Sequence, residues 1–111
     1  MLEEFKEKKI LILGLGKEGT STLRFIRKKF PNKIIGIADQ KTKKQLDKYL
    51  QKIIEKDKKL LLHLGKKYLE SLNLYEVVFK SPGVQLPKSS TAKSHHRQQF
   101  LLKTSGRKLS E

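Results

Sequence analysis

Apolar residues along positions 1–87 follow two alternating patterns, one typical of buried strands and the other of amphipathic helices. Short apolar runs rich in branched side chains predict strands of a parallel sheet at Lys9–Leu13, Ile34–Ala38, Leu60–Leu64 and Glu76–Phe79. Apolar positions at helical spacing predict helices between them, at Lys17–Phe30, Thr42–Lys56 and Lys66–Leu72. Strands that alternate with helices indicate βαβ units with right-handed crossovers and a mostly parallel sheet.

This pattern ends after Pro87. Residues 88–111 show neither the strand period nor the helix period, and their only apolar cluster is Phe100–Leu102. We therefore predict an α/β fold, a Rossmann-like parallel sheet of four strands in the order 3-2-1-4 with helices on both faces and a fifth strand lost or degraded. The predicted organisation is one domain over residues 1–87 and an irregular basic tail over residues 88–111. One hypothesis for this tail is a frameshift from Ser94 onward.

A glycine-rich turn, GLGKEG, begins at Gly14, between the first predicted strand and the first predicted helix. Its spacing is G-x-G-x-x-G, in the strand–turn–helix context that a phosphate-binding turn requires. Gly14 permits a tight turn, Gly16 lets the backbone approach a pyrophosphate, and Gly19 permits close packing of helix on strand. The free amides and the dipole of the helix start then bind the anion. Glu18 is unfavourable beside a phosphate, so its side chain is expected to point away, with Lys17 offsetting its charge. The alternative is a purely structural turn.

Asp39 follows the second predicted strand, 20 residues after Gly19. A carboxylate at this place can accept hydrogen bonds from a ribose hydroxyl or from an N–H group of a base. The alternative is an aspartate that caps the helix expected to start near Thr42.

The fourth predicted strand ends in a turn formed by Ser81, Pro82 and Gly83. In a sheet ordered 3-2-1-4 the strand order reverses between strands 1 and 4, and ligands bind at the carboxyl ends of the strands beside such a reversal. We therefore expect this turn to face the glycine-rich turn across a crevice. Ser81 offers a hydroxyl there, and Gly83 lets the backbone approach a nucleotide. A turn without a ligand is the alternative.

The formal net charge of +15 raises the question of nucleic-acid binding. The lysines are spread over helices and loops among acidic residues, without the interleaved aromatics of a single-strand-binding groove, so a solvated lysine-rich surface is favoured. The chain has no cysteine, no apolar run long enough for a membrane helix and no secretory signal pattern at its start. We expect a cytoplasmic domain without a membrane or a specific nucleic-acid partner.

Three segments together resemble the amino-terminal domain of the UDP-N-acetylmuramoyl-L-alanine:D-glutamate ligases of the Mur ligase family. They are KKILILGLGKEGTSTLRFI, IIGIADQ and HLGKKYLESLNLYEVVFKSPGVQLP, and they cover about residues 8–87. The resemblance implies that this domain binds the UDP part of the substrate. It places Lys17, Glu18 and Gly19 along the pyrophosphate, Asp39 and Gln40 at the uracil end, and Ser81, Pro82 and Gly83 over the phosphates. Family members often have threonine where this chain has Gln40.

The resemblance also implies an ATP-dependent amide ligation. In that reaction ATP and Mg²⁺ phosphorylate the carboxylate of UDP-N-acetylmuramoyl-L-alanine, and the amine of D-glutamate attacks the acyl phosphate. The step needs a phosphate-binding loop of the G-K-[ST] type, and this tripeptide does not occur in the sequence. We expect the central ATPase domain and the C-terminal domain to be absent. The chain is then predicted to bind UDP-N-acetylmuramoyl-L-alanine as a monomer, with no cofactor, metal or catalytic residue of its own.

Other interpretations remain open from the sequence. An NAD(P)-binding Rossmann domain of a regulatory protein or oxidoreductase has the same glycine turn and the same aspartate after the second strand. A basic nucleic-acid-binding module is a second alternative. Within the Mur ligases, the L-alanine-adding enzyme is the nearest relative to be distinguished. His63 is expected to be a packed or rim histidine, and the pair His95 and His96 is not expected to be a metal site.

Overall fold

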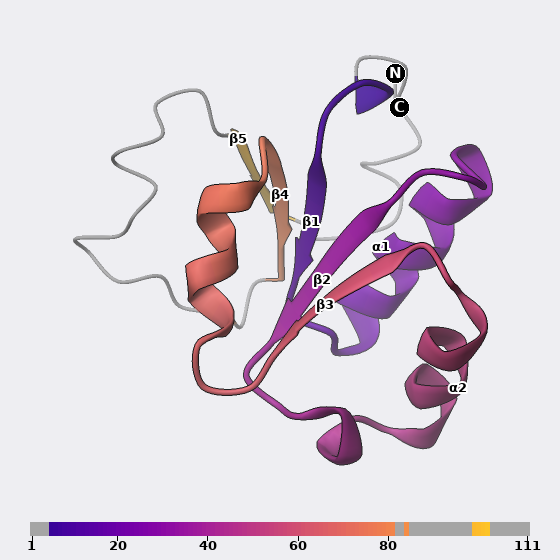
Figure 1. Cartoon of the computed structure of the whole chain (residues 1–111), viewed down its shortest axis with the longest axis vertical. Helices are drawn as coiled ribbons and strands as arrows, with labels where there is room; N and C mark the ends of the chain where they lie inside the picture. The colour runs from indigo at the N-terminus through magenta and orange to yellow at the C-terminus, as the bar shows by residue number, and fades with distance from the viewer. Residues whose placement is uncertain (1–4, 82–83, 85–98, 103–111) are drawn as a thin grey trace.

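The centre of the molecule is a parallel β-sheet whose strands lie in the order β3-β2-β1-β4-β5 (Figure 1). The computed structural model describes residues 5–81, 84 and 99–102. Its strands are β1 (Ile10–Leu13), β2 (Ile35–Asp39), β3 (Leu60–Leu64), β4 (Val77–Lys80) and β5 (Gln99–Leu102). Its helices are α1 (Lys17–Lys29), α2 (Lys48–Lys56) and two 3₁₀ helices, η2 (Lys43–Gln45) and η3 (Tyr68–Leu74). The α/β class and the predicted order of the first four strands are confirmed.

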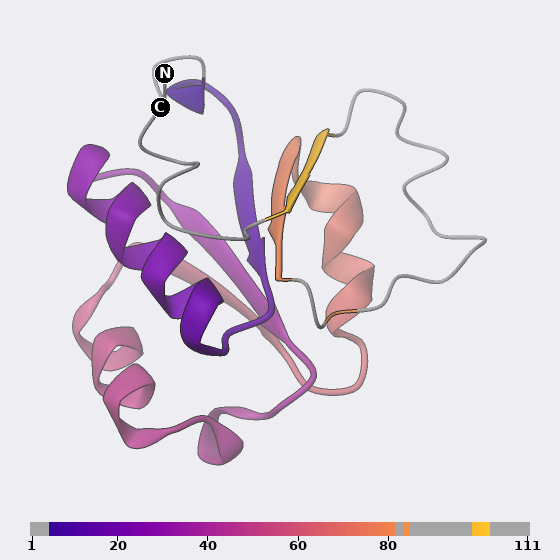
Figure 2. The same ribbon diagram turned by 180° about the vertical axis from the view of Figure 1, so that it is seen from behind.

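Helices cover the sheet on both faces, as predicted. On one face, buried side chains of α1 and α2 pack against the strands, among them Leu23, Ile26 and Leu50. On the other face, Leu72 of η3 and the adjacent Tyr75 pack against the strands. Figure 2, which shows the molecule from behind, has α1 in front of the sheet and η3 behind it. This cover on both faces explains why the central strands are continuous apolar runs and do not alternate with polar residues.

The helix predicted over Thr42–Lys56 is interrupted. Only η2 forms at the start of this stretch, Leu46 is extended, and α2 begins after Asp47. The physical reason is a second helix cap, because the Asp47 carboxylate accepts a hydrogen bond from the backbone N–H of Leu50 at 2.8 Å. The helix predicted over Lys66–Leu72 is likewise a 3₁₀ helix that starts two residues later. Apolar spacing located both stretches but not their local hydrogen bonding.

A fifth strand is present where the sequence predicted none. β5 lies beside β4 in parallel register, with Gln99 opposite Val77 and Leu102 opposite Lys80. It contains the cluster Phe100–Leu102, which is too short to show a periodic pattern. Pairing with β4 defines it as a strand, so part of the segment predicted to be an irregular tail belongs to the sheet.

Arg27, near the C-terminal end of α1, joins this helix to the loops that precede β2 and β3. Its guanidinium forms a two-pronged ion pair with Asp57, with N–O distances of 2.8 and 3.2 Å. It also donates hydrogen bonds to the carbonyl oxygens of Phe30, Lys33 and Lys59. The two charged side chains are only 19% and 17% exposed, so solvent screens the pair less than it screens a surface pair. The planar guanidinium suits this task because it offers several donors in a fixed geometry.

We expect Arg27→Ala to lower the free energy of unfolding by about 2 kcal/mol, because it leaves a partly buried carboxylate and several carbonyl groups without their donor. Arg27→Lys should recover little of this loss, since an ammonium cannot form the two-pronged contact. Urea unfolding followed by circular dichroism measures both effects. The matched control is Arg24→Ala on the same helix, where the side chain is exposed and a change within about 0.5 kcal/mol is expected. Equal losses for the two alanine variants would contradict the role given to Arg27.

Candidate functional site

A pocket of about 460 Å³ lies at the carboxyl ends of β1, β2 and β4. This volume falls within the range of small-molecule sites, roughly 300–1,000 Å³. Within the sheet, β2 and β3 lie on one flank of β1, and β4 lies on its other flank. The pocket therefore lies where the strand order reverses. The residues that line it come from three separate turns: Gly14, Leu15, Gly16, Lys17, Glu18, Asp39, Ser81 and Val84.

The glycine turn has the geometry that its spacing predicts. Gly14 has a φ of +96°, a conformation that other residues rarely adopt, and its N–H donates to the carbonyl oxygen of Ala38 at 2.7 Å. A Cβ atom on Gly19 would lie 1.8 Å from the carbonyl oxygen of Gly14, so only glycine lets α1 approach the turn this closely. A Cβ atom on Gly16 would meet nothing within 4 Å. This glycine therefore leaves open space in front of the turn.

The start of α1 supplies backbone donors beside the pocket. Gly16 is the N-cap of α1, and no side chain forms a capping hydrogen bond there. The first N–H groups of an α-helix have no partner within the helix, and the helix dipole adds partial positive charge at this end. Together these features make the start of α1 suitable for a phosphate group.

Asp39, at the end of β2, connects that strand to the glycine turn. One carboxylate oxygen accepts from the N–H of Leu15 at 2.6 Å, and the other accepts from the N–H of Lys41 at 2.8 Å. Thr42, and not Asp39, is the N-cap of the 3₁₀ helix that follows, so the alternative of a capping aspartate is wrong. Each carboxylate oxygen keeps acceptor capacity for a further donor from a ligand.

Ser81, directly after β4, brings the second turn against the first. Its N–H donates to the carbonyl oxygen of Leu13 at 3.0 Å, and its hydroxyl donates to the carbonyl oxygen of Gly14 at 3.3 Å. The N–H of Val84 donates to the carbonyl oxygen of Ser81 at 3.1 Å and closes this turn. The two turns therefore face each other across one pocket, as the strand order predicts. Pro82 and Gly83 lie outside the described residues.

Three other residues of this region differ in their positions. Lys17 lines the pocket and is exposed. Gln40 is exposed and is not among the described residues that line the pocket, so a contact with a base stays a prediction. Glu18 is among the residues that line the pocket, and its Oε1 atom is buried without a hydrogen-bond partner, so the direction expected for its side chain stays a prediction. Val84 also lines the pocket, which the sequence gave no signal to predict.

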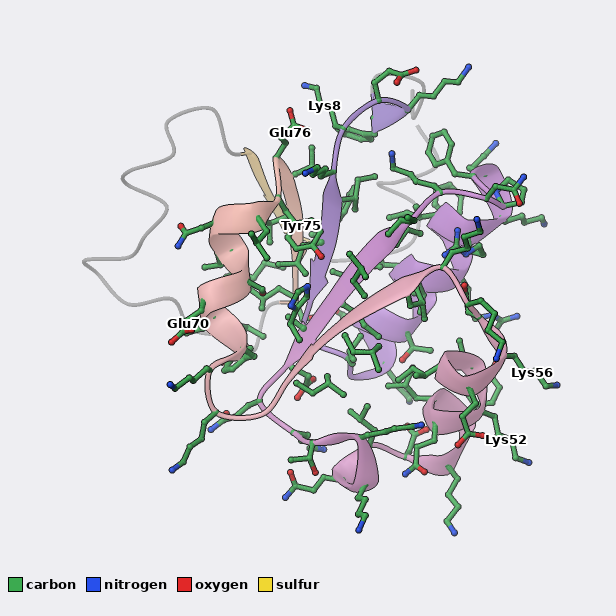
Figure 3. All side chains as sticks on the ribbon, viewed as in Figure 1. Lys8, Lys52, Lys56, Glu70, Tyr75 and Glu76 are labelled. Atoms are coloured by element: carbon green, nitrogen blue, oxygen red, sulfur yellow. The ribbon has the colours of Figure 1, made fainter. Side chains whose placement is uncertain are left out.

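His63 on β3 lies outside this pocket. Its Nε2 atom shares a hydrogen bond of 2.7 Å with the hydroxyl of Tyr75, and the two rings meet edge to face. Tyr75, labelled in Figure 3, lies against the sheet beside η3. Burial lowers the pKa of His63 and raises the pKa of Tyr75. Within the described part of the chain, no group of three His, Asp or Glu side chains could hold a metal ion. The half-buried position of His63 and its contact with Tyr75 agree with the expectation of a packed or rim histidine.

The lowered pKa of His63 makes one contribution to stability depend on pH. Because the folded pKa lies below the unfolded value of 6.5, this contribution is fully present above pH 6.5 and is lost as the pH falls from 6.5 through the folded pKa. We therefore expect the stability difference between the parent chain and His63→Gln to shrink as the pH is lowered. Urea unfolding of both proteins at several values between about pH 5 and 8 measures it. A difference that stays constant over this range would contradict the assignment.

Two lysines of α2 lie away from the pocket. Lys52 and Lys56 of α2 point outward from the sheet (Figure 3).

Among the described residues, no helix is long and apolar enough to cross a membrane.

Comparison with known proteins adds one positive finding. A family model described as "Mur ligase MurD-like, N-terminal domain" matches residues 8–100. The matched range contains both turns of the pocket and reaches into β5. A search of curated proteins found no match to this chain.

Proposed function

Because the chain belongs to the family of MurD-like N-terminal domains of Mur ligases, the ligases of peptidoglycan synthesis, we propose that it binds the uridine diphosphate part of UDP-N-acetylmuramoyl-L-alanine. One observation carries this proposal: the glycine turn after β1 and the Ser81 turn after β4 line the same pocket and are joined by a hydrogen bond. A diphosphate is a suitable ligand for this place, since it accepts hydrogen bonds from backbone amides at a helix start.

Several residues at the site have a defined task in this proposal. The free amides at the start of α1 donate to the diphosphate, and Gly16 leaves room for it. Ser81 lines the pocket from the turn after β4. Pro82 and Gly83, which lie outside the described residues, are proposed to contact the phosphates. Asp39 accepts from a hydroxyl or N–H group at the nucleoside end, with Gln40 beside it.

We further propose that the full enzyme adds D-glutamate to this substrate in the cytoplasm, with ATP and Mg²⁺ in the ligation step. A G-K-[ST] phosphate loop does not occur in the 111 residues, and we propose that they bind the substrate without catalysing ligation by themselves. We also propose that the chain binds as a monomer.

Calorimetric titration of the chain with UDP and with NADH tests the nucleotide assignment. We expect heat of binding with UDP and much weaker binding of NADH, because the family model that matches the chain is that of a Mur ligase domain. Tighter binding of NADH would favour the NAD(P)-binding alternative. Binding to unrelated RNA or DNA that weakens steeply with salt would favour the nucleic-acid-binding alternative. Either result would overturn the proposal.

A further inference from the structure

Among the described residues that line the pocket, Glu18 has a buried side-chain oxygen without a partner. Its Oε1 atom is the only buried side-chain nitrogen or oxygen without a hydrogen bond in the described part of the chain. Helix side chains tilt toward the N-terminus of their helix. The carboxylate of Glu18, in the first turn of α1, therefore extends toward the end of the helix that faces the pocket.

The pocket has an unfavourable balance of charged side chains for a diphosphate. Two carboxylates line it, those of Glu18 and Asp39, against the single ammonium group of Lys17. Lys17 is exposed, so water and salt screen its charge. The net charge of +15 attracts anions to the molecule as a whole, but it does not remove the repulsion between a carboxylate and a phosphate in contact.

The two carboxylates are not equivalent. Both oxygens of Asp39 accept backbone N–H groups, so this side chain is held in place by the turns. Glu18 has no such contact at Oε1, so one oxygen of its carboxylate keeps its full acceptor capacity. Glu18 is thus free to bind a group that arrives with the ligand.

We propose that the diphosphate binds in this pocket as its magnesium complex, and that the Glu18 carboxylate is the protein's ligand to that ion. This inference rests on the proposed function, because the diphosphate brings the ion. Mg²⁺ commonly binds through one or two carboxylates together with substrate phosphates and water. The described residues offer no group of three ligating side chains, so phosphate oxygens and water complete the coordination. The ion turns the repulsion between Glu18 and the diphosphate into an attraction.

Titration of the full chain with UDP in excess Mg²⁺, and in EDTA at the same ionic strength, tests this inference. We expect UDP to bind roughly tenfold more tightly with Mg²⁺, a typical coupling between two ligands of one protein. Glu18→Gln, of the same shape but unable to replace a carboxylate at the ion, should bind UDP with equal affinity in both buffers. The matched control is Glu55→Gln on α2, which removes the same charge from an exposed position outside the pocket and should keep the dependence on Mg²⁺.

A second measurement locates the ion directly. With Mn²⁺ in place of Mg²⁺, the NMR signals of the Glu18 and Gly19 amides should broaden when UDP is present and stay sharp when it is absent. UDP binding that is equal in Mg²⁺ and EDTA, or a Glu18→Gln variant that keeps the dependence, would overturn this inference and leave the proposed function standing. Absence of UDP binding in both buffers would overturn the proposed function, and the inference with it.

Discussion

A Gly19→Ala variant is expected to lose about 3 kcal/mol of stability, at the upper end of the usual cost of overpacking. The added Cβ atom would lie 1.8 Å from the carbonyl oxygen of Gly14, a backbone atom that cannot turn aside. That same oxygen accepts the hydrogen bond from Ser81, so its displacement disturbs both turns of the pocket. Urea unfolding measures the loss of stability, and calorimetry should show that UDP binding is lost as well.

Gly16→Ala is the matched control for this variant. The new methyl group meets no atom within 4 Å, and the φ of −76° suits alanine. Its stability is therefore expected to stay within about 0.5 kcal/mol of the parent chain. The methyl group would occupy the open space in front of the turn, so UDP affinity should still fall roughly tenfold, or about 1.4 kcal/mol. An unfolded Gly16→Ala, or a stable Gly19→Ala with full binding, would contradict the roles assigned to these glycines.

The roles of the glycines were predictable from the sequence because each depends on neighbours within one strand–turn–helix unit. The spacing placed Gly14 at a tight turn and Gly19 under the helix, and the structure has both. The opposed position of Ser81 was also predictable, because the strand order 3-2-1-4 places the ends of β1 and β4 side by side. These predictions depend on the glycine spacing and the strand order, and not on the position of any side chain.

Other features depend on contacts between distant parts of the chain. β5 is defined by its pairing with β4, and strand formation depends more on such neighbours than on the local sequence. The late start of α2 depends on which polar side chain caps the helix, and Asp47 is that side chain. The burial of the Glu18 oxygen depends on how the turns pack around the pocket. Apolar periodicity carries no information on any of these.

Asp39 illustrates how a structural task and a binding task can fall on one side chain. Its carboxylate holds the N–H of Leu15 in the glycine turn and the N–H of Lys41 in the next loop. The sequence interpretations treated ligand binding and a structural contact as alternatives. In the structure Asp39 lines the pocket while it makes both backbone contacts, so its structural contacts do not exclude a contact with a ligand.

We expect Asp39→Ala to lose about 2 kcal/mol of stability, because the partly buried N–H of Leu15 is left without an acceptor. UDP binding should become undetectable even under conditions in which the variant is folded, since the glycine turn loses its anchor and the nucleoside end loses an acceptor. Asp47→Ala is the matched control, because it also removes an aspartate that accepts a backbone N–H. Losing this helix cap should lower the free energy of unfolding by about 1 kcal/mol. Asp47 does not line the pocket, so its variant should bind UDP like the parent chain. Because the two variants share the loss of a backbone contact, a selective loss of binding in Asp39→Ala would separate binding from general destabilisation. Equal UDP affinity for the two variants would mean that Asp39 serves the fold alone.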